Sequence, residues 1–201
     1  MRPIIELLFD FVSPNAYLVW HPLKALAQRT GADIKVTPAY LGGIMEMTGN
    51  QPPMMRDGAI KGKNDYTILE IRRFCARHGL SKFQINPHFP FRSLTLQRYL
   101  LAADEEASRQ WMMDVLLPML WEDKLDPKDT KTIDAALTAA GFEMDSLKAK
   151  AGTAAIKEAL KANTAEAVER GAFGIPTFFI GDEMFFGKER LGQIEEMLTG
   201  A

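Results

Sequence analysis

The chain of 201 residues has little of what usually marks disulfide-stabilised, metal-binding or nucleic-acid-binding proteins. Its one cysteine, Cys75, excludes an intrachain disulfide and fits a reducing compartment. The only histidines, His21, His78 and His88, show no metal-ligand spacing with each other or with the cysteine, so we expect no metal site. The 24 basic and 26 acidic residues are well mixed and give a formal net charge of −2. This balance offers no basic surface for nucleic acid or an anionic membrane.

Long apolar runs are also missing from the sequence. No uninterrupted stretch approaches the roughly 18 residues of a membrane span, and Glu6 and Asp10 interrupt the apolar N-terminal stretch that could imitate a signal peptide. We therefore expect a cytoplasmic protein without a membrane partner. The hydrophobic content of 47% and the charged content of 25% are typical of a globular protein with a sizeable core. Small molecules or proteins are the expected partners.

The N-terminal segment predicts a strand, a helix and a second strand. The stretch "PIIELLFDF" is rich in branched and aromatic residues, as a buried strand is. Ser13 then suits a helix N-cap, and Pro14 suits the first helical position, where its missing N–H has no intrahelical partner. We expect the helix to run to about Arg29 and to end at Gly31. The stretch "DIKVTPAY" supplies the second strand, and a right-handed crossover makes the two strands parallel.

The middle of the chain divides into a loop and a helical region. Residues 41–65 are dense in Gly, Pro and Met without clear periodicity, which predicts a loop that leaves the sheet. From 66 to about 171 the pattern is mostly helical. The first of these helices should bury a stripe of Ile68, Ile71, Phe74 and Cys75, and Cys75 fits a buried apolar face better than a reactive role. The last should begin at a cap formed by Asp145 and continue to Gly171.

The last thirty residues predict a hairpin and a helix. Two apolar stretches, "IPTFFI" and "MFF", flank a Gly-Asp turn. The stretch "GKERLGQIEEML" then opens a helix with Leu191, Ile194 and Leu198 on one face. The predicted order is therefore β-α-β, a helical insertion, and β-β-α.

This order is the topology of the thioredoxin fold. In that fold the proline that opens the third strand is cis and faces the N-terminus of the first helix, and here Pro176 of "GIPT" holds that position. The chain resembles the kappa-class glutathione transferases and the 2-hydroxychromene-2-carboxylate isomerases of the thioredoxin superfamily. The resemblance covers essentially the whole chain and rests on "FDFVSPNAYL", "LGGIMEMTGNQPP", "FGIPTFFIGDEMFFGKERL" and the helical insertion.

The resemblance implies an α/β protein with a thioredoxin-like fold and a large all-helical insertion. Residues 1–43 and 172–201 would form the thioredoxin-like domain, and residues 44–171 would form the helical insertion domain. It also implies a homodimer.

A serine stands where disulfide oxidoreductases of the same superfamily carry a reactive thiol. Those relatives have Cys-Pro-X-Cys where this chain has "SPNA" from residue 13 onward, so disulfide exchange cannot occur here. The resemblance implies that glutathione brings the thiol and that Ser13 is the catalytic residue that stabilises its thiolate. Free N–H groups and the positive end of the helix dipole favour the charged sulfur. A serine nucleophile would need a base, and His21 lies about two turns down the helix. A plain helix cap is the alternative role for Ser13.

The other glutathione contacts are also implied by the resemblance. The backbone of Ile175, before Pro176, would pair with the cysteinyl unit. The relatives bind the γ-glutamyl end with "FG-[SN]-D-R", which corresponds here to Phe186, Gly187, Lys188, Glu189 and Arg190. A helix that starts at Lys188 would accept the ligand carboxylate on its backbone N–H groups, and the acidic side chain of Glu189 would pair with the ligand ammonium. This chain departs from the pattern, because Lys188 replaces a small polar residue and Glu189 is one methylene longer than Asp. Asn50 and a lysine of "KGKND", Lys63 in preference to Lys61, match positions near the glycyl end.

The substrate pocket is less well marked. Met45, together with Met47, Met54 and Met55, flanks Asn50, and these methionines either line an adaptable pocket or pack the loop. Arg92 is a candidate for binding a substrate carboxylate, and a surface role for it is the alternative. Asn15 and Ala16 depart from relatives that carry an aromatic residue after "SP".

The function implied by the resemblance is glutathione-dependent cis-trans isomerisation of 2-hydroxychromene-2-carboxylate-like aromatic acids, as in aromatic compound degradation. The thiolate would add to an unsaturated carbon, allow rotation, and leave again. A kappa-class-like transferase that conjugates glutathione to electrophiles is the alternative. A non-catalytic module that binds peptides along the Pro176 edge is a third hypothesis.

Overall fold

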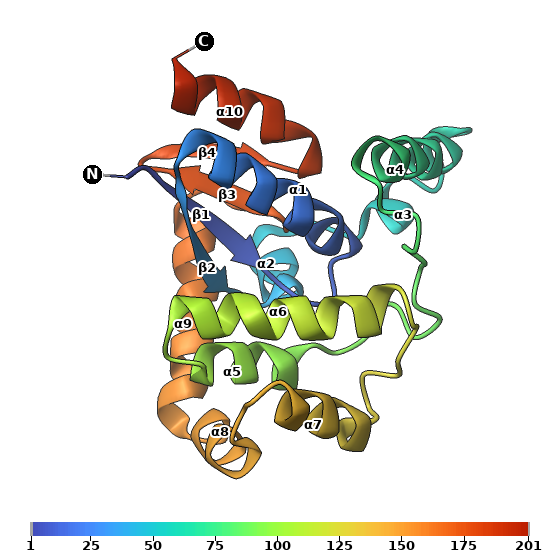
Figure 1. The fold of residues 1–201 in the computed structure, drawn as a ribbon. Coiled ribbons are helices and arrows are strands. Elements are labelled where there is room, and N and C mark those ends of the chain that lie inside the picture. The colour runs from blue at the N-terminus through green and yellow to red at the C-terminus, as the bar shows by residue number, and fades with distance from the viewer. Residues whose placement is uncertain (1, 201) are drawn as a thin grey trace.

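A mixed four-stranded sheet forms the centre of the computed structural model, which describes residues 2–200 (Figure 1). The strands are β1 (Ile4–Phe9), β2 (Asp33–Pro38), β3 (Thr177–Ile180) and β4 (Glu183–Phe186), and their order in the sheet is β2-β1-β3-β4. β1 runs parallel to β2 and antiparallel to β3, and β4 pairs antiparallel with β3. The predicted β-α-β and β-hairpin units are confirmed.

Helix α1 (Pro14–Thr30) follows β1 as the sequence predicts. Ser13 is its N-cap with extended backbone angles (φ −83°, ψ 113°), and its side chain accepts a hydrogen bond from the N–H of Ala16. Gly31 ends the helix at φ 69°, a backbone conformation that glycine adopts without steric cost. The helix buries large side chains such as Trp20 and Leu23. Both ends of the helix are therefore encoded by local residues.

The C-terminal helix begins later than predicted. Lys188–Arg190 form a 3₁₀ turn, η1, and the α-helix α10 runs over Leu191–Thr199. Its residues Leu191 and Ile194 are buried. Figure 1 shows α10 and α1 packed together on one face of the sheet. The predicted helix start at Lys188 is thus corrected to Leu191, because the chain first has to turn away from the edge strand β4.

The segment 41–65, predicted as a loop, contains two whole helices, α2 (Leu41–Thr48) and α3 (Pro53–Arg56), and the start of a third at Lys63. The loop prediction was wrong because two glycines in α2 serve close packing. A Cβ on Gly43 would lie 3.1 Å from Cγ2 of Thr164 in α9 (Ala154–Glu169), and a Cβ on Gly42 would meet the ring of Tyr40 at 2.8 Å. Tertiary packing therefore overrides the low helix propensity of glycine in this segment.

The helical insertion also contains α4 (Lys63–His78), α5 (Leu94–Ala102), α6 (Glu106–Trp121), α7 (Thr130–Ala139) and α8 (Met144–Ala151). The single helix expected from Asp145 to Gly171 is two helices, α8 and α9. Glu143 is the N-cap of α8, and Asp145 lies in its first turn. The break comes from Thr153, whose hydroxyl accepts a hydrogen bond from the N–H of Ile156 and starts α9.

Helices of the insertion cover the second face of the sheet, where α5, α6 and α9 contact β2. Figure 1 places α3 and α4 to one side of this body. No residue of α4 is fully buried, and Ile68, expected on its buried stripe, is 42% exposed. The predicted division into a thioredoxin-like domain and a helical insertion domain stays a prediction, and its boundary at 43/44 lies inside α2. Within residues 2–200, no helix combines the length and apolarity needed to cross a membrane.

Candidate active site

Ser13 lies at the start of α1 and contacts the loop that precedes β3. Its hydroxyl donates a hydrogen bond to the carbonyl oxygen of Ile175 at 3.0 Å and accepts one from the N–H of Ala16 at 3.2 Å. The residue is 1% exposed. The serine therefore does more than cap the helix, because it also joins two segments that lie far apart in the sequence.

The predicted cis peptide bond before Pro176 is present. The carbonyl oxygen of Pro176 accepts a hydrogen bond from the N–H of Gly187 at 3.0 Å. Gly187 has φ 96°, a conformation that strongly favours glycine. The structure thus brings Ser13, Ile175, Pro176 and Gly187 together. All four residues are buried, and we call this cluster the groove, a name for the residues and not for a cavity.

A fully buried carboxyl group holds the turn between β1 and α1 from behind. Asp10 accepts hydrogen bonds from the backbone N–H groups of Val12, at 3.2 Å, and Leu41, at 2.8 Å. Burial raises the pKa of Asp10 to about 6. Our reading of the sequence missed this residue, although an acid between the two apolar residues of "FDF" was a visible signal.

Two further side chains of the helical insertion fix the same turn. The amide of Gln97, which is fully buried in α5, donates to the carbonyl oxygens of Phe9 at 2.7 Å and Ala39 at 2.9 Å, and accepts from the N–H of Phe11 at 3.4 Å. The indole N–H of Trp121 in α6 donates to the carbonyl oxygen of Phe11 at 3.0 Å. The insertion therefore fixes the backbone that presents Ser13. Sequence reasoning missed Gln97, whose signal is a polar residue within an apolar helix stripe.

Asn50 approaches the groove from the loop between α2 and α3. Its side-chain amide donates a hydrogen bond to the carbonyl oxygen of Phe173 at 2.7 Å. The ring of Phe173 lies 4.4 Å, centroid to centroid, from that of Phe186. A Cβ on Gly174 would come within 2.8 Å of the Phe186 ring, so glycine is needed for this packing. Asn50 and Phe186 therefore both contact the loop that leads into Ile175.

Lys188 and Glu189 form an ion pair with each other. Lys188 is only 6% exposed, and its ammonium lies 5.4 Å from the ring centroid of Phe74 in α4. The carboxylate of Glu189 was expected to pair with a ligand ammonium, and in this structure its partner is the neighbouring lysine. A Cβ on Gly187 would lie 3.0 Å from Oε2 of Glu189, which places this carboxylate over the groove residue.

Three other predicted site residues make no hydrogen bond or ion pair with the groove in the described chain. Lys63 forms an ion pair with Asp57 at 3.0 Å. Hydrogen bonds from Arg56, and to a lesser extent from Lys63, hold the pKa of the Asp57 carboxyl far below its usual value. Met45 is half-buried in α2, and Arg92 is exposed just before α5. Their predicted roles stay predictions.

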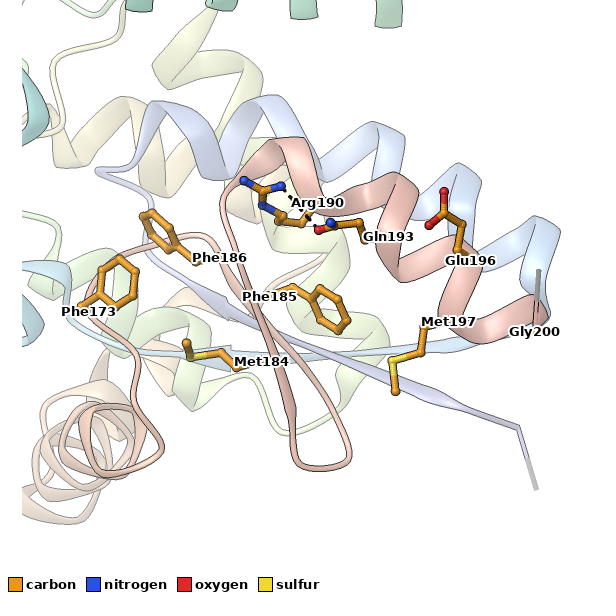
Figure 2. A pocket seen from close by; sticks show the side chains of 9 residues that line it. All are labelled: Phe173, Met184, Phe185, Phe186, Arg190, Gln193, Glu196, Met197 and Gly200. Carbon is orange, nitrogen blue, oxygen red and sulfur yellow. Dashed lines mark hydrogen bonds between the residues drawn. The ribbon is translucent and has the colours of Figure 1, made fainter.

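Two hollows lie beside the groove. The larger hollow, of about 860 Å³, lies along β4 and α10 (Figure 2). Its lining includes Phe186 of β4 and Phe173 of the loop that leads to Ile175. The smaller, of about 390 Å³, lies between α1, α4 and α10 and includes Lys188 and Glu189. Ser13 lines neither hollow. The hollows therefore border Phe173 and the pair of Lys188 and Glu189, and neither reaches Ser13.

The free cysteine lies outside this arrangement. Cys75 is half-buried in α4, and burial raises the pKa of its thiol. A raised pKa leaves less thiolate at neutral pH and lowers reactivity. Within residues 2–200, no group of three or more His, Cys, Asp or Glu side chains is placed to hold a metal ion.

Known proteins resemble this chain over nearly its whole length. A 2-hydroxychromene-2-carboxylate isomerase of Pseudomonas putida is 28% identical over 196 residues, which cover 97% of this chain and 94% of the relative. Glutathione S-transferase kappa 1 of Rattus norvegicus is 28% identical over 214 residues, which cover 97% and 90%. Among solved structures, a 2-hydroxychromene-2-carboxylate isomerase matches with a TM-score of 0.84 and 26% identity, over 98% of this chain and 95% of that one.

A family model agrees with the geometry. The DSBA-like thioredoxin domain model matches residues 4–199. The sheet order, the cis-proline loop opposite the start of α1 and the helical insertion are the features of this fold that the structure displays. The chain therefore belongs to the family of DSBA-like thioredoxin domains.

Proposed function

We propose that this protein is a glutathione-dependent isomerase of 2-hydroxychromene-2-carboxylate-like aromatic acids. The observation that carries the proposal is the contact of the Ser13 hydroxyl with the carbonyl oxygen of Ile175, at 3.0 Å beside the cis proline. A serine at this place cannot exchange disulfides but can hold a thiolate. The isomerase relative supports an enzyme of this substrate class, and the glutathione S-transferase kappa relative supports the use of glutathione.

The residues present fit glutathione, a tripeptide with two charged ends. The positive end of the α1 dipole lies at Ser13 and favours an anionic sulfur, although Pro14 has no N–H and the N–H of Ala16 is already bonded to Ser13. The backbone of Ile175 offers peptide-like pairing, Asn50 is bonded to the carbonyl oxygen of Phe173 in the loop before Ile175, and the Glu189 carboxylate lies close to Gly187. Bound glutathione would supply a thiolate that adds to an unsaturated carbon of the substrate and later leaves it.

The single proton of the Ser13 hydroxyl serves two acceptors in this proposal. In the structure the hydroxyl donates this proton in a hydrogen bond to the carbonyl oxygen of Ile175. When an anionic sulfur is present, the hydroxyl can turn its proton toward it, because charged acceptors form the stronger hydrogen bond. The carbonyl oxygen of Ile175 is then free to accept a backbone N–H of the ligand. Binding of the thiol and release of this internal hydrogen bond are therefore coupled.

A kappa-class-like transferase is the second candidate, because the rat kappa 1 relative matches over as much of the chain as the isomerase does. The two reactions need the same stabilised thiolate and differ in whether the thiol is released. Peptide binding without catalysis is the third candidate. We also propose a cytoplasmic homodimer on the strength of the resemblance.

The deciding experiment supplies 2-hydroxychromene-2-carboxylate with glutathione at a tenth of the substrate concentration. An isomerase converts all the substrate because each glutathione is used repeatedly. A transferase instead conjugates an aryl halide with one-for-one loss of free thiol and leaves the chromene unchanged. If calorimetry detects no binding of millimolar glutathione, both enzyme proposals are wrong and the peptide-binding module is the remaining candidate.

A further inference from the structure

The outer edge of β4 is open and apolar. β4 is the last strand in the sheet order, so no strand within residues 2–200 pairs with its outer side. Three consecutive residues of β4, Met184, Phe185 and Phe186, line the larger hollow (Figure 2). Because successive side chains of a strand point to opposite faces of the sheet, a hollow lined by all three runs along the edge of the strand. Phe186 is 40% exposed, and Phe173, whose ring packs on it, is 38% exposed.

The hydrogen bonds between β3 and β4 show which backbone groups this edge offers. The N–H of Gly187 donates to the carbonyl oxygen of Pro176, which lies directly opposite in the register of the two strands. Hydrogen-bonded and non-hydrogen-bonded pairs alternate along an antiparallel ladder. Met184 and Phe186 are therefore in non-hydrogen-bonded pairs, and their N–H and C=O groups point away from β3. These groups lie symmetrically on either side of Phe185.

An edge of this kind is a template for another strand. Proteins usually protect an edge strand with lysine, proline, a bulge or a covering segment. β4 contains neither lysine nor proline, and its single charged residue, Glu183, stands at its first position. A strand added to β4 would pair its outward backbone groups and bury its exposed apolar side chains.

The stripe of side chains beside this edge indicates what the added strand belongs to. Arg190, Gln193 and Glu196 follow one another at intervals of three residues and line the same hollow (Figure 2). Within residues 2–200, neither Arg190 nor Glu196 forms an ion pair, and Arg190 donates to Gln193 at 3.4 Å. The stripe is thus positive at one end and negative at the other. Two antiparallel copies of it would place Arg190 of each copy opposite Glu196 of the other, so the stripe is complementary to itself.

We propose that β4 of this chain pairs antiparallel with β4 of a second copy, around a two-fold axis at Phe185. Met184 of each copy then exchanges both backbone hydrogen bonds with Phe186 of the other, and the two sheets join into one. The two stripes of α10 meet across the same axis. The inference rests on the homodimer proposed above, for which it supplies the interface, and not on the reaction.

The test measures the dimer dissociation constant of the full-length protein and its variants by sedimentation equilibrium. The wild type should be a dimer. Met184→Pro removes an N–H that points away from β3, which an edge strand tolerates, and should weaken the dimer by about tenfold or more. Glu196→Arg brings like charges together and should also weaken it by about tenfold or more. Adding Arg190→Glu to Glu196→Arg reverses the pair and should restore the dissociation constant to within about threefold of the wild-type value.

Glu158→Arg is the matched control for the charge reversal. Glu158 is an exposed glutamate that pairs with Lys161 in α9, away from the hollow, so its reversal should leave the dissociation constant unchanged. Circular dichroism verifies that each variant is folded.

Three results would overturn the inference. If the wild type is a monomer at every concentration, the homodimer and its interface are both wrong, and the proposed isomerase activity stands. If the wild type is a dimer that Met184→Pro and Glu196→Arg do not weaken, the homodimer stands but its interface lies elsewhere. A double variant that stays as weak as Glu196→Arg would show that the two stripes do not meet.

Discussion

The turn that presents Ser13 and the arm formed by α3 and α4, residues 53–78, are built in opposite ways. Residues 10–13 of the turn are all buried, and side chains from distant parts of the chain hold them. The arm lies to one side in Figure 1, and no residue of α3 or α4 is fully buried. Its exposed large apolar residues are Met54, Met55, Ile60, Tyr66, Ile68 and Leu69.

The difference shows where the precision of the site originates. Opening the turn would break buried hydrogen bonds, so it should open only with the whole domain. The arm has few buried contacts to lose, so it should open at a much lower free energy. A residue in the turn can therefore hold a fixed geometry, whereas a residue in the arm, such as Lys63, should be more mobile. Substitutions in the two regions measure this contrast directly.

The largest expected fall in the free energy of unfolding comes from replacing the buried amide of Gln97. Gln97→Leu removes the partners of the Ala39 carbonyl oxygen and the Phe11 N–H, while the Phe9 carbonyl oxygen keeps its bond from the Ala39 N–H. Leaving buried polar groups unpaired costs about 1–3 kcal/mol each, so we expect a loss of about 3 kcal/mol or more. Urea denaturation measures it.

Gln84 offers a matched control for this prediction. It is exposed, and its amide donates to the carbonyl oxygen of Glu122 at 3.0 Å. Gln84→Leu should cost less than about 1 kcal/mol, because water can replace the lost hydrogen bond. Equal losses in the two variants would contradict the view that the insertion holds the turn.

The parts of the fold that sequence reasoning predicted are those encoded by neighbouring residues. The Ser13 cap, the stop at Gly31 and the hairpin turn are local signals, and all are present. The helix α2 was missed because its glycines favour a loop, whereas Gly43 packs closely against Thr164, which is distant in the sequence. Local pattern cannot reveal such a contact.

The site follows the same rule. The resemblance located Ser13, Ile175 and Pro176, because these positions belong to two short motifs. Asp10 and Gln97 were missed, because their roles arise from hydrogen bonds across 31 and 88 residues of sequence. The pairing of Lys188 with Glu189 was also missed, since the sequence does not reveal which neighbouring charges turn toward each other.

The second prediction concerns the buried carboxyl of the turn. The pKa of Asp10 is about 6 in the folded protein against 3.8 for the ordinary group, so the folded state favours the protonated form. Its contribution to stability is therefore largest below about pH 4 and is lost as the pH rises through about 6. At 1.36 kcal/mol per pKa unit, the loss is about 3 kcal/mol.

Asp10→Asn isolates this effect, because asparagine does not titrate. The free energy of unfolding of the wild type minus that of the variant should fall by about 3 kcal/mol between pH 4 and pH 7. Urea denaturation at several pH values gives this difference. If the free energies of unfolding of the wild type and the variant change in parallel with pH, Asp10 is not held in a water-excluded turn. That result would weaken the contrast between the turn and the arm.

A smaller effect is expected for the serine itself. Ser13→Ala removes an N-cap bond and the bond to the carbonyl oxygen of Ile175, and we expect a loss of about 2 kcal/mol. Thr153→Ala also removes a cap bond and a bond to a carbonyl oxygen, that of Lys150, but at the exposed start of α9, where water can replace them, and it should cost about 1 kcal/mol. Ser13→Ala should also raise the pKa of the thiol of bound glutathione, and the ultraviolet absorbance of the thiolate measures this pKa. An unchanged thiol pKa would reduce Ser13 to a structural cap.

The smallest effect is expected in the arm, where two isoleucines of α4 allow a matched comparison. Ile68 is 42% exposed, whereas Ile71 is half-buried against the core. Ile68→Ser should change the free energy of unfolding by less than about 0.5 kcal/mol, because an exposed side chain loses little contact with other residues. Ile71→Ser removes packed apolar surface and should cost about 1–2 kcal/mol. Denaturation at two protein concentrations tests whether the chain associates. If the loss of stability caused by Ile68→Ser grows with protein concentration, a second copy of the chain covers the arm. The arm would then be buried as the turn is.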